Sequence, residues 1–283
     1  MDIKFSDFLR HWRTKRHLSQ LQLAMQAGVS ARHISFLESG RSNPSKPMII
    51  LLAQSLQIPK AATNQAFLAA GFAPVFKQHP QDHSDIAQIN QAVATTLENH
   101  MPLPAIVLDR HWNITNANPA ATRLIGGIGL SGHSNLIEAT TSDTAVRRIE
   151  NWPEASLLLL QRLRQEYLES GGDKVLGALI KKLRARIQQE LGDHPPDIDY
   201  SQAVLPTRFV FEGHKLSLFS AIAQFGSVFD TNLADIRIEL MFPLNAETRT
   251  YFTQIPHPET PPLPPSAVDE TPHGRTPRGL GRG

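Results

Sequence analysis

The chain has 283 residues, of which 41% are hydrophobic and 19% are charged, and this length predicts about two globular domains. The absence of cysteine excludes disulfides and cysteine-ligated zinc sites, as is typical of a protein in a reducing cytoplasm. The longest apolar runs, such as residues 48–53, are too short to cross a bilayer, and the charged first residues lack the apolar stretch of a signal peptide. We therefore expect a cytoplasmic protein that does not enter a membrane.

The net charge of +2 is distributed unevenly along the chain. Residues 1–46 contain eight Lys and Arg against three Asp and Glu, whereas residues 47–271 contain seventeen against twenty-three. Residues 272–283 add three arginines and no acid. A basic segment attached to an acidic body is typical of a nucleic-acid-binding module joined to a domain that has a different partner.

Five helices are predicted near the N-terminus from the spacing of apolar residues. They are expected over 5–16, 20–27, 31–39 and 60–70, with a further helix that carries Leu51, Leu52 and Leu56. Ser19 and Ser30 are suited to cap the second and third helices, and Gly28 stands where the chain needs a left-handed residue. These signals predict an all-α domain over residues 1–76.

The following residues change in character. Residues 77–84 are polar and contain a proline, so we interpret 77–99 as a linker and a connecting helix over 85–99. Strands are then predicted over 105–109, 112–116, 207–212, 215–225 and 236–242, with helices over 118–125 and within 142–191. The strand over 215–225 is apolar on both faces, as a doubly covered central strand would be.

The overall fold class is therefore expected to be α+β. Residues 100–255 should form a second domain of five short strands interrupted by a helical insertion. In that insertion Val175, Leu179, Leu183, Ile187 and Leu191 repeat every four residues. Residues 256–283 are rich in Pro, Gly and Arg and have too little apolar content to fold, so we expect a disordered tail.

The segment over 18–41 resembles the helix-turn-helix of phage repressors and Cro, the XRE-like class. The likeness combines the two serine caps, Gly28, the inward positions Leu23, Ile34 and Leu37, and the closing Gly40. In such a module the second helix enters the major groove of double-stranded DNA and its first residues reach the base edges. The candidate DNA-binding residues are Gln20, Ser30, Ala31, Arg32, His33, Ser35, Phe36, Arg41, Ser42 and Asn43.

These residues are expected to have different roles at the DNA. Arg32 is the best candidate for a bidentate contact to guanine, although a phosphate contact without sequence information is the alternative. Gln20 should bind a phosphate, and Arg41 should touch the backbone. In this fold class an acid at the position of Glu38 pairs with an arginine of the first helix, which implies a structural pair with Arg13.

Further stretches carry a second resemblance. They are Pro104 to Asn113, Asn116 to Ala121, Asn151-Trp152, Phe219 to Gly226 and Leu233 to Glu239, together with Ser30 to His33 and Ala70 to Pro74. They look like the MmyB-like transcription regulators, in which an XRE-type helix-turn-helix is joined to a PAS-like ligand-binding domain. The resemblance implies an antiparallel sheet domain that senses a small, largely apolar molecule. A cavity lined by aromatic side chains of the strands would favour a fatty acid or another hydrophobic metabolite.

Aromatic side chains on the predicted strands are the candidates to line such a cavity. The candidate ligand-binding residues are Trp112, Phe209, Phe211, Phe219 and Phe225, with Asn116 and Arg237 as contacts to a polar head group. The alternatives are that these rings fill an ordinary core and that Arg237 points to solvent.

Other signals do not support catalysis or metal binding. Residues 127–132 match G-x-G-x-x-G, but no strand precedes them, and His79 and His83 have no third ligand. We therefore expect no metal, no cofactor and no enzyme, since no nucleophile–base arrangement supports the alternative of a DNA-tethered enzyme. The sequence favours a one-component transcriptional regulator that binds its operator as a homodimer. The alternative is a DNA-binding adaptor or antitoxin whose C-terminal domain binds a protein.

Overall fold

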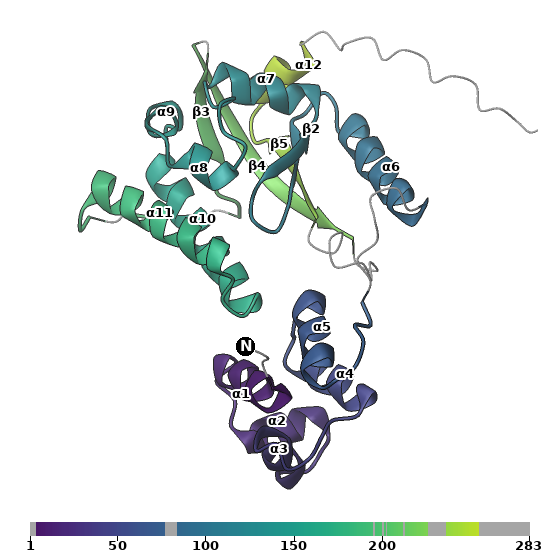
Figure 1. The fold of residues 1–283 in the computed structure, drawn as a ribbon. Helices are drawn as coiled ribbons and strands as arrows, with labels where there is room; N and C mark the ends of the chain where they lie inside the picture. The colour runs from purple at the N-terminus through teal and green to yellow at the C-terminus, as the bar shows by residue number, and fades with distance from the viewer. Residues whose placement is uncertain are drawn as a thin grey trace, which may run out of the picture.

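The computed structural model describes residues 4–76, 84–194, 196–199, 201, 203–211, 213–225 and 236–254. The chain forms an N-terminal helical domain and a C-terminal domain with one sheet, so the predicted α+β class is confirmed (Figure 1). The tail expected over 256–283 and most of the expected linker lie outside the described residues.

The N-terminal domain consists of the five predicted helices. They are α1 (Phe5–Lys15), α2 (Gln20–Ala27), α3 (Ala31–Glu38), α4 (Lys46–Ser55) and α5 (Lys60–Ala69). Each apolar stripe found in the sequence faces one shared core, which includes Leu9, Trp12, Leu23, Ile34 and Phe67. This core fixes the angle between α2 and α3, on which the function of the domain depends.

The C-terminal domain is built on an antiparallel sheet of five strands, as predicted. The strands are β1 (Ala105–Leu108), β2 (Ile114–Ala117), β3 (Thr207–Phe211), β4 (His214–Gln224) and β5 (Arg237–Pro243), in the order β2-β1-β5-β4-β3. The long insertion between β2 and β3 is helical, and β1 pairs directly with β5 across it. Segments far apart in sequence therefore meet at the centre of the sheet.

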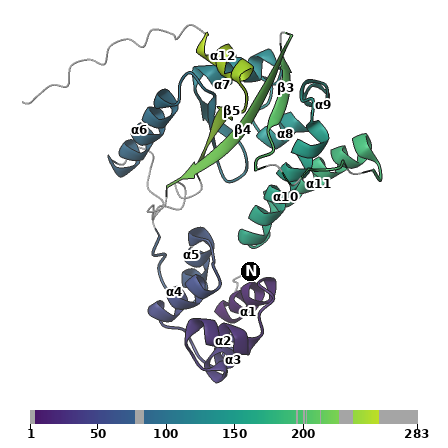
Figure 2. The ribbon, with the colours of Figure 1, turned by 180° about the vertical axis from the view of Figure 1, so that it is seen from behind.

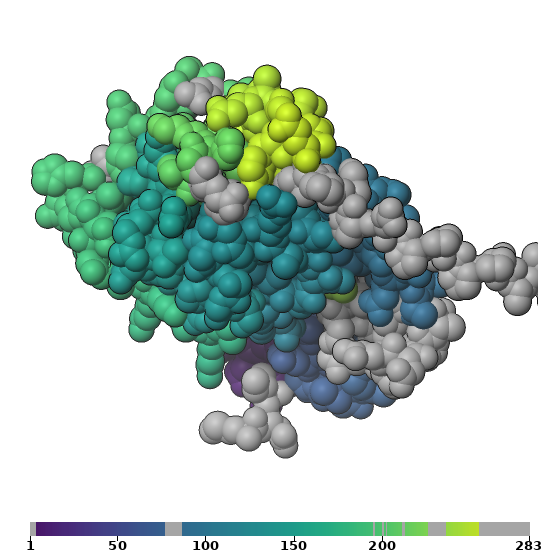
Figure 3. Space-filling model, turned by 90° about the horizontal axis from the view of Figure 1, so that it is seen from above, coloured from purple at the N-terminus to yellow at the C-terminus, as the bar shows by residue number. Residues whose placement is uncertain are grey.

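Helices cover the two faces of this sheet unequally. One face packs against α7 (Pro119–Gly127), α8 (Leu136–Thr140), α9 (Asp143–Arg148), α10 (Trp152–Glu169), α11 (Lys174–Leu191) and α12 (Ala246–Thr253). The other face packs against α6 (Ser84–Asn99) through Val93 and Leu97, which meet Ala105, Val107 and Ile238 (Figure 2). We call these the core face and the α6 face. Seen from the end opposite the N-terminal domain, α12 lies at the surface (Figure 3).

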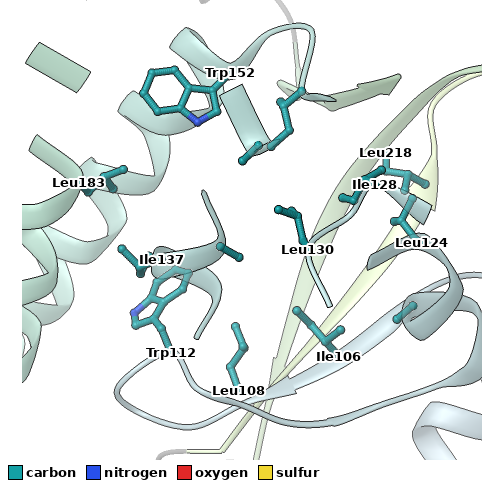
Figure 4. Close-up of a cluster of buried hydrophobic side chains, with 14 of the residues drawn as sticks. Ile106, Leu108, Trp112, Leu124, Ile128, Leu130, Ile137, Trp152, Leu183 and Leu218 are labelled. Carbon is teal, nitrogen blue, oxygen red and sulfur yellow. The ribbon is translucent and has the colours of Figure 1, made fainter. Parts of the chain in front are cut away.

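The main core lies on the core face. Trp112 and Trp152 lie in different parts of it, with Ile137, Leu130 and Ile106 between the sheet and the helices (Figure 4). Burying one such large side chain stabilises the fold by roughly 1.5–3 kcal/mol, so this cluster is the main source of the domain's stability.

Three sequence expectations are wrong in detail. Trp112 is not on a strand but in the turn between β1 and β2, with a φ of +67°. The strand β4 is buried only at Leu216, Ser217 and Leu218, and its second half is largely exposed, so it is not covered throughout. In α11 the buried residues are Leu176, Leu179, Leu183 and Ile187, whereas Val175 of the four-residue repeat is 46% exposed.

Candidate functional sites

The turn between α2 and α3 is fixed by local hydrogen bonds. Ser19 and Gln22 form a reciprocal capping box at the start of α2, and the Ser30 hydroxyl accepts from the backbone N–H of His33 at the start of α3. Gly28 has a φ of +64°, a conformation that a side chain would strain, and it ends α2. The two helices are therefore held at a defined angle.

The outer surface of α3 carries two exposed cations around one ring. The guanidinium groups of Arg32 and Arg41 lie 5.2 and 5.9 Å from the centroid of the Phe36 ring. The backbone N–H of Arg41 donates to the carbonyl of Phe36 at 2.9 Å, which places the arginine at the end of the helix. Of the other candidates, Ser30 and Asn43 are exposed and Ala31, His33, Ser35 and Ser42 are partly exposed. All of these candidates are therefore at least partly exposed, on α3 or in the residues that flank it.

Gln20 has a different environment from the one expected. Its side-chain Nε2 donates to Glu38 Oε2 at 2.8 Å, so this amide faces the protein. One N–H of this amide is thus used by Glu38, while its second N–H has no protein partner among the contacts of the described residues. The expected phosphate contact of Gln20 therefore stays a prediction, to which the backbone N–H groups at the start of α2 can add.

The expected pair between Arg13 and Glu38 is confirmed. Arg13 Nε donates to Glu38 Oε1 at 2.6 Å and Arg13 Nη2 donates to Glu38 Oε2 at 2.9 Å. Arg13 Nη1 also donates to the carbonyl of Leu18 at 2.7 Å, and Arg10 Nη2 donates to the carbonyl of Glu38 at 2.6 Å. The carboxylate of Glu38, 2% exposed, therefore connects α1 to the end of α3.

This environment shifts the pKa of the pair. Burial of the Glu38 carboxyl opposes ionisation, but hydrogen bonds from Arg13 and Gln20 and the charges of Arg13 and Arg10 outweigh it, so the pKa of Glu38 is lowered. The hydrogen bonds that Arg13 donates to Glu38 raise the pKa of Arg13. The pair is therefore ionised at neutral pH.

Acidification should weaken the N-terminal domain through Glu38. Because its pKa is lower in the folded chain, ionised Glu38 stabilises the fold above its unfolded value of about 4.3, and this contribution is lost as the pH falls through the folded pKa. The difference in melting temperature between the wild type and Glu38→Gln, measured from pH 6 to pH 3, should shrink on acidification. A constant difference would show that the charge of Glu38 is not what stabilises the domain.

A second cluster surrounds Trp112 in the C-terminal domain. The indole Nε1 donates to Glu166 Oε2 at 2.7 Å, and the guanidinium groups of Arg162 and Arg237 lie 4.4 and 4.8 Å from the ring centroid. Arg237 Nη1 is paired with Glu166 Oε1, and its Nη2 donates to the carbonyl of Asp109 at 2.8 Å. Arg237 is 5% exposed, so it does not point to solvent.

This cluster retains polar atoms without a protein partner. Arg162 Nη2 and Arg237 Nε are buried and make no hydrogen bond, although both guanidinium groups lie over the Trp112 ring. Both arginines line an open cleft of about 1950 Å³ between the two domains. This cleft is also lined by Trp12, Arg16, Leu176 and Ile222 and by the acids Glu166, Glu169 and Asp173. Ile222 lies on the uncovered half of β4 and is 44% exposed. The cleft thus combines cationic groups with apolar surface.

The other candidate ligand residues do not line one cavity with Trp112. Phe209 packs on the core face, whereas Phe225 packs on the α6 face and Phe219 stacks on Phe242 with a centroid distance of 5.6 Å. Asn116 is exposed on β2, and its Oδ1 accepts from the backbone N–H of Ala117. The side chain of Phe211 lies outside the described residues. Side chains alternate between faces, which separates aromatics that sequence analysis grouped together.

Sequence analysis missed Arg162 and Glu166 as site residues. Both lie on α10, where they occupy positions of an ordinary amphipathic helix. The only available signal was their spacing of four residues, which places an arginine and an acid on one side of a helix. Among the described residues no group of three His, Asp or Glu is placed to hold a metal ion.

Comparisons with known proteins agree with this architecture. A family model described as the MmyB-like transcription regulator ligand-binding domain matches residues 89–254, and a helix-turn-helix model matches residues 9–61. An uncharacterised HTH-type transcriptional regulator of Bacillus subtilis (strain 168), RghRB, is 31% identical over 104 residues, which cover 35% of this chain and 73% of that protein. No helix in the described part of the chain is long and apolar enough to span a membrane.

Proposed function

Because the chain belongs to the MmyB-like transcription regulators, we propose that it is a one-component regulator in which a small apolar ligand controls DNA binding. It is a DNA-binding transcription regulator with an XRE-type helix-turn-helix and a ligand-binding domain. We assign DNA binding to residues 1–76 and ligand binding to residues 100–255. No catalytic role is proposed.

Sequence readout is assigned to the exposed side of α3. Arg32 lies in the first turn of this helix, the part that reaches base edges when such a helix enters the major groove. A guanidinium in this position can donate two hydrogen bonds to a guanine. Arg41, at the other end of the helix, is assigned to a phosphate. The chain is proposed to bind as a homodimer, because such modules read paired half-sites.

The ligand is assigned to the cleft beside Trp112, and the unpartnered nitrogens of Arg162 and Arg237 are the observation that supports this site. Buried N–H groups without an acceptor are costly, and a carboxylate is the acceptor that suits a guanidinium best. The exposed Ile222 offers apolar surface to the rest of the molecule. An amphipathic carboxylate such as a fatty acid has both properties.

Binding of laurate to protein stripped by denaturation and refolding tests this site. Laurate should raise the melting temperature of the wild type, and Arg162→Met should weaken laurate binding by about ten-fold, as expected for loss of one charge-assisted hydrogen bond. The matched control is Arg186→Met in α11. Like Arg162, Arg186 is ion-paired and has one buried nitrogen without a partner, its Nε, but it does not line the cleft.

Methyl laurate, which has no charge, should bind the wild type more weakly than laurate does. Its affinity should be the same for the wild type and for Arg162→Met. Equal laurate binding by the two arginine variants would reject the assigned head-group site. A stripped protein that binds no apolar molecule would favour a domain that binds a protein partner instead.

A further inference from the structure

The turn between α10 and α11 contacts α1 of the N-terminal domain. Arg16 Nη1 donates to the carbonyl of Leu168 at 2.8 Å, and Arg16 Nη2 donates to that of Glu169 at 2.9 Å. These carbonyls lie in the last turn of α10, where the helix dipole is negative and a cation is favoured. The same guanidinium donates to the carbonyls of Leu56 and Gln57, both at 2.9 Å. Arg16 therefore joins the ends of α4 and α10.

Two glycines allow the close approach of the two domains. Gly171 and Gly172 have φ values of +76° and +87° and follow the end of α10. A Cβ atom added to Gly171 would lie 2.2 Å from Cη2 of Trp12, and one added to Gly172 would lie 2.2 Å from Nζ of Lys15. Trp12 belongs to the hydrophobic core of its own domain, so it cannot move away freely. The turn is shaped to fit α1.

The same helix leads back to the cluster around Trp112. Glu166, one turn before the end of α10, holds both Trp112 and Arg237. On the other side of the contact, α1 holds the end of α3 through Arg13 and Glu38. Contacts thus run from Trp112 along α10 to α1 and from there to α3, and α10 ends beside α1 in both views (Figures 1 and 2).

We propose that the turn between α10 and α11 is a docking surface for α1, and that a ligand beside Trp112 changes DNA binding by strengthening or weakening this docking. The second clause rests on the proposed ligand-binding function. A ligand can shift the equilibrium only if its affinities for the docked and undocked forms differ. Glu166 provides that difference, because the residue that holds the ligand-site arginine also belongs to the last turns of the docking helix. The connecting helix α6 packs on the α6 face of the sheet, away from α10, and so takes no part in this contact.

The docking surface is tested by the distance between the two domains in solution. The chain has no cysteine, so Met25→Cys and Leu244→Cys, at exposed positions in the two domains, accept one spin label each. Pulsed electron paramagnetic resonance should give a narrow distance distribution for this protein. Adding Gly171→Ala should broaden it, because the new Cβ would meet Trp12. Gly213→Ala, at a φ of +82° with open space around it, imposes the same backbone strain without a contact and should leave it narrow.

A compensating variant separates loss of docking from a damaged turn. Trp12→Phe removes the outer ring atoms that a Cβ at Gly171 would meet, so Trp12→Phe with Gly171→Ala should narrow the distribution again. A Gly171→Ala distribution as narrow as that of the parent would overturn the docking surface. A broad distribution that Trp12→Phe does not narrow would overturn it as well, since the contact would not be its cause.

The coupling is tested with DNA selected by the wild type from a random pool. Laurate should change the affinity of the wild type and of Gly213→Ala for this DNA by about 5-fold or more, a usual range for coupling between sites, and that of Gly171→Ala by less than about 2-fold. An equal laurate effect in all three proteins would overturn the coupling. Absence of a laurate effect on the wild type would reject the proposed ligand instead, and the distance measurements would still decide the docking surface.

Discussion

Replacing Glu38 by alanine should destabilise the N-terminal domain by about 3 kcal/mol, the low end of what removal of one member of a buried ion pair costs. The carboxylate is 2% exposed and accepts from Arg13 and Gln20, so its loss leaves a largely buried guanidinium, 15% exposed, without its counter-ion. The free energy of opening of α1–α5, measured by amide hydrogen exchange in the full chain, should fall by this amount.

Two further variants test whether Arg13 and Glu38 stabilise the domain as a pair. Replacing both members, with Arg13→Met and Glu38→Leu, should recover most of the loss, because no charge then remains buried. Recovery should be incomplete, since the Gln20 amide loses its acceptor. The matched control is Lys182→Ala, which breaks a half-exposed ion pair with Glu138 and should cost less than about 1 kcal/mol. If the losses of stability in Arg13→Met and in Glu38→Leu, each measured alone, simply add in the double variant, the two residues do not act as a pair.

Local signals explain why the N-terminal domain could be predicted from sequence. Serine caps, a left-handed glycine and apolar residues at helical spacing are each read from residues close in sequence, and Ser19, Gly28 and Ser30 act as expected. Each helix begins and ends within about one residue of its predicted limit where both limits were predicted. The hydrogen bond from Gln20 to Glu38 was not predicted, because the two residues are eighteen positions apart in sequence.

The turn before β2 shows how a local signal was missed. Asp109 Oδ1 accepts from the backbone N–H groups of His111 and Asn113, a turn typical of aspartate. This turn places Trp112 in the left-handed region and directs its ring into the core. The apparent alternation of Trp112 and Ile114 therefore reflected a turn followed by a strand, and Asp109 was the residue that could have shown it.

The candidate ligand site depended on contacts that sequence patterns do not contain. Glu166 and Arg237 are 71 residues apart and meet only because β5 lies at the centre of the sheet with α10 against its core face. The aromatic residues were recognised by type, but their faces are set by strand register. Phe209 lies on β3 and Phe219 on β4, and they point to opposite faces of the sheet. Composition therefore indicated an apolar domain but not which residues share a cavity.

Binding of the full chain to single-base variants of its selected duplex tests whether α3 reads DNA sequence. Arg32→Ala should weaken binding by about 1–3 kcal/mol and remove the preference at one base pair. Arg41→Ala is the matched control, since it also removes a guanidinium next to Phe36. It should weaken all duplexes alike and reduce the slope of log affinity against log salt by about 1. If Arg32→Ala instead lowers affinity uniformly for all the single-base variants, α3 does not read bases through Arg32.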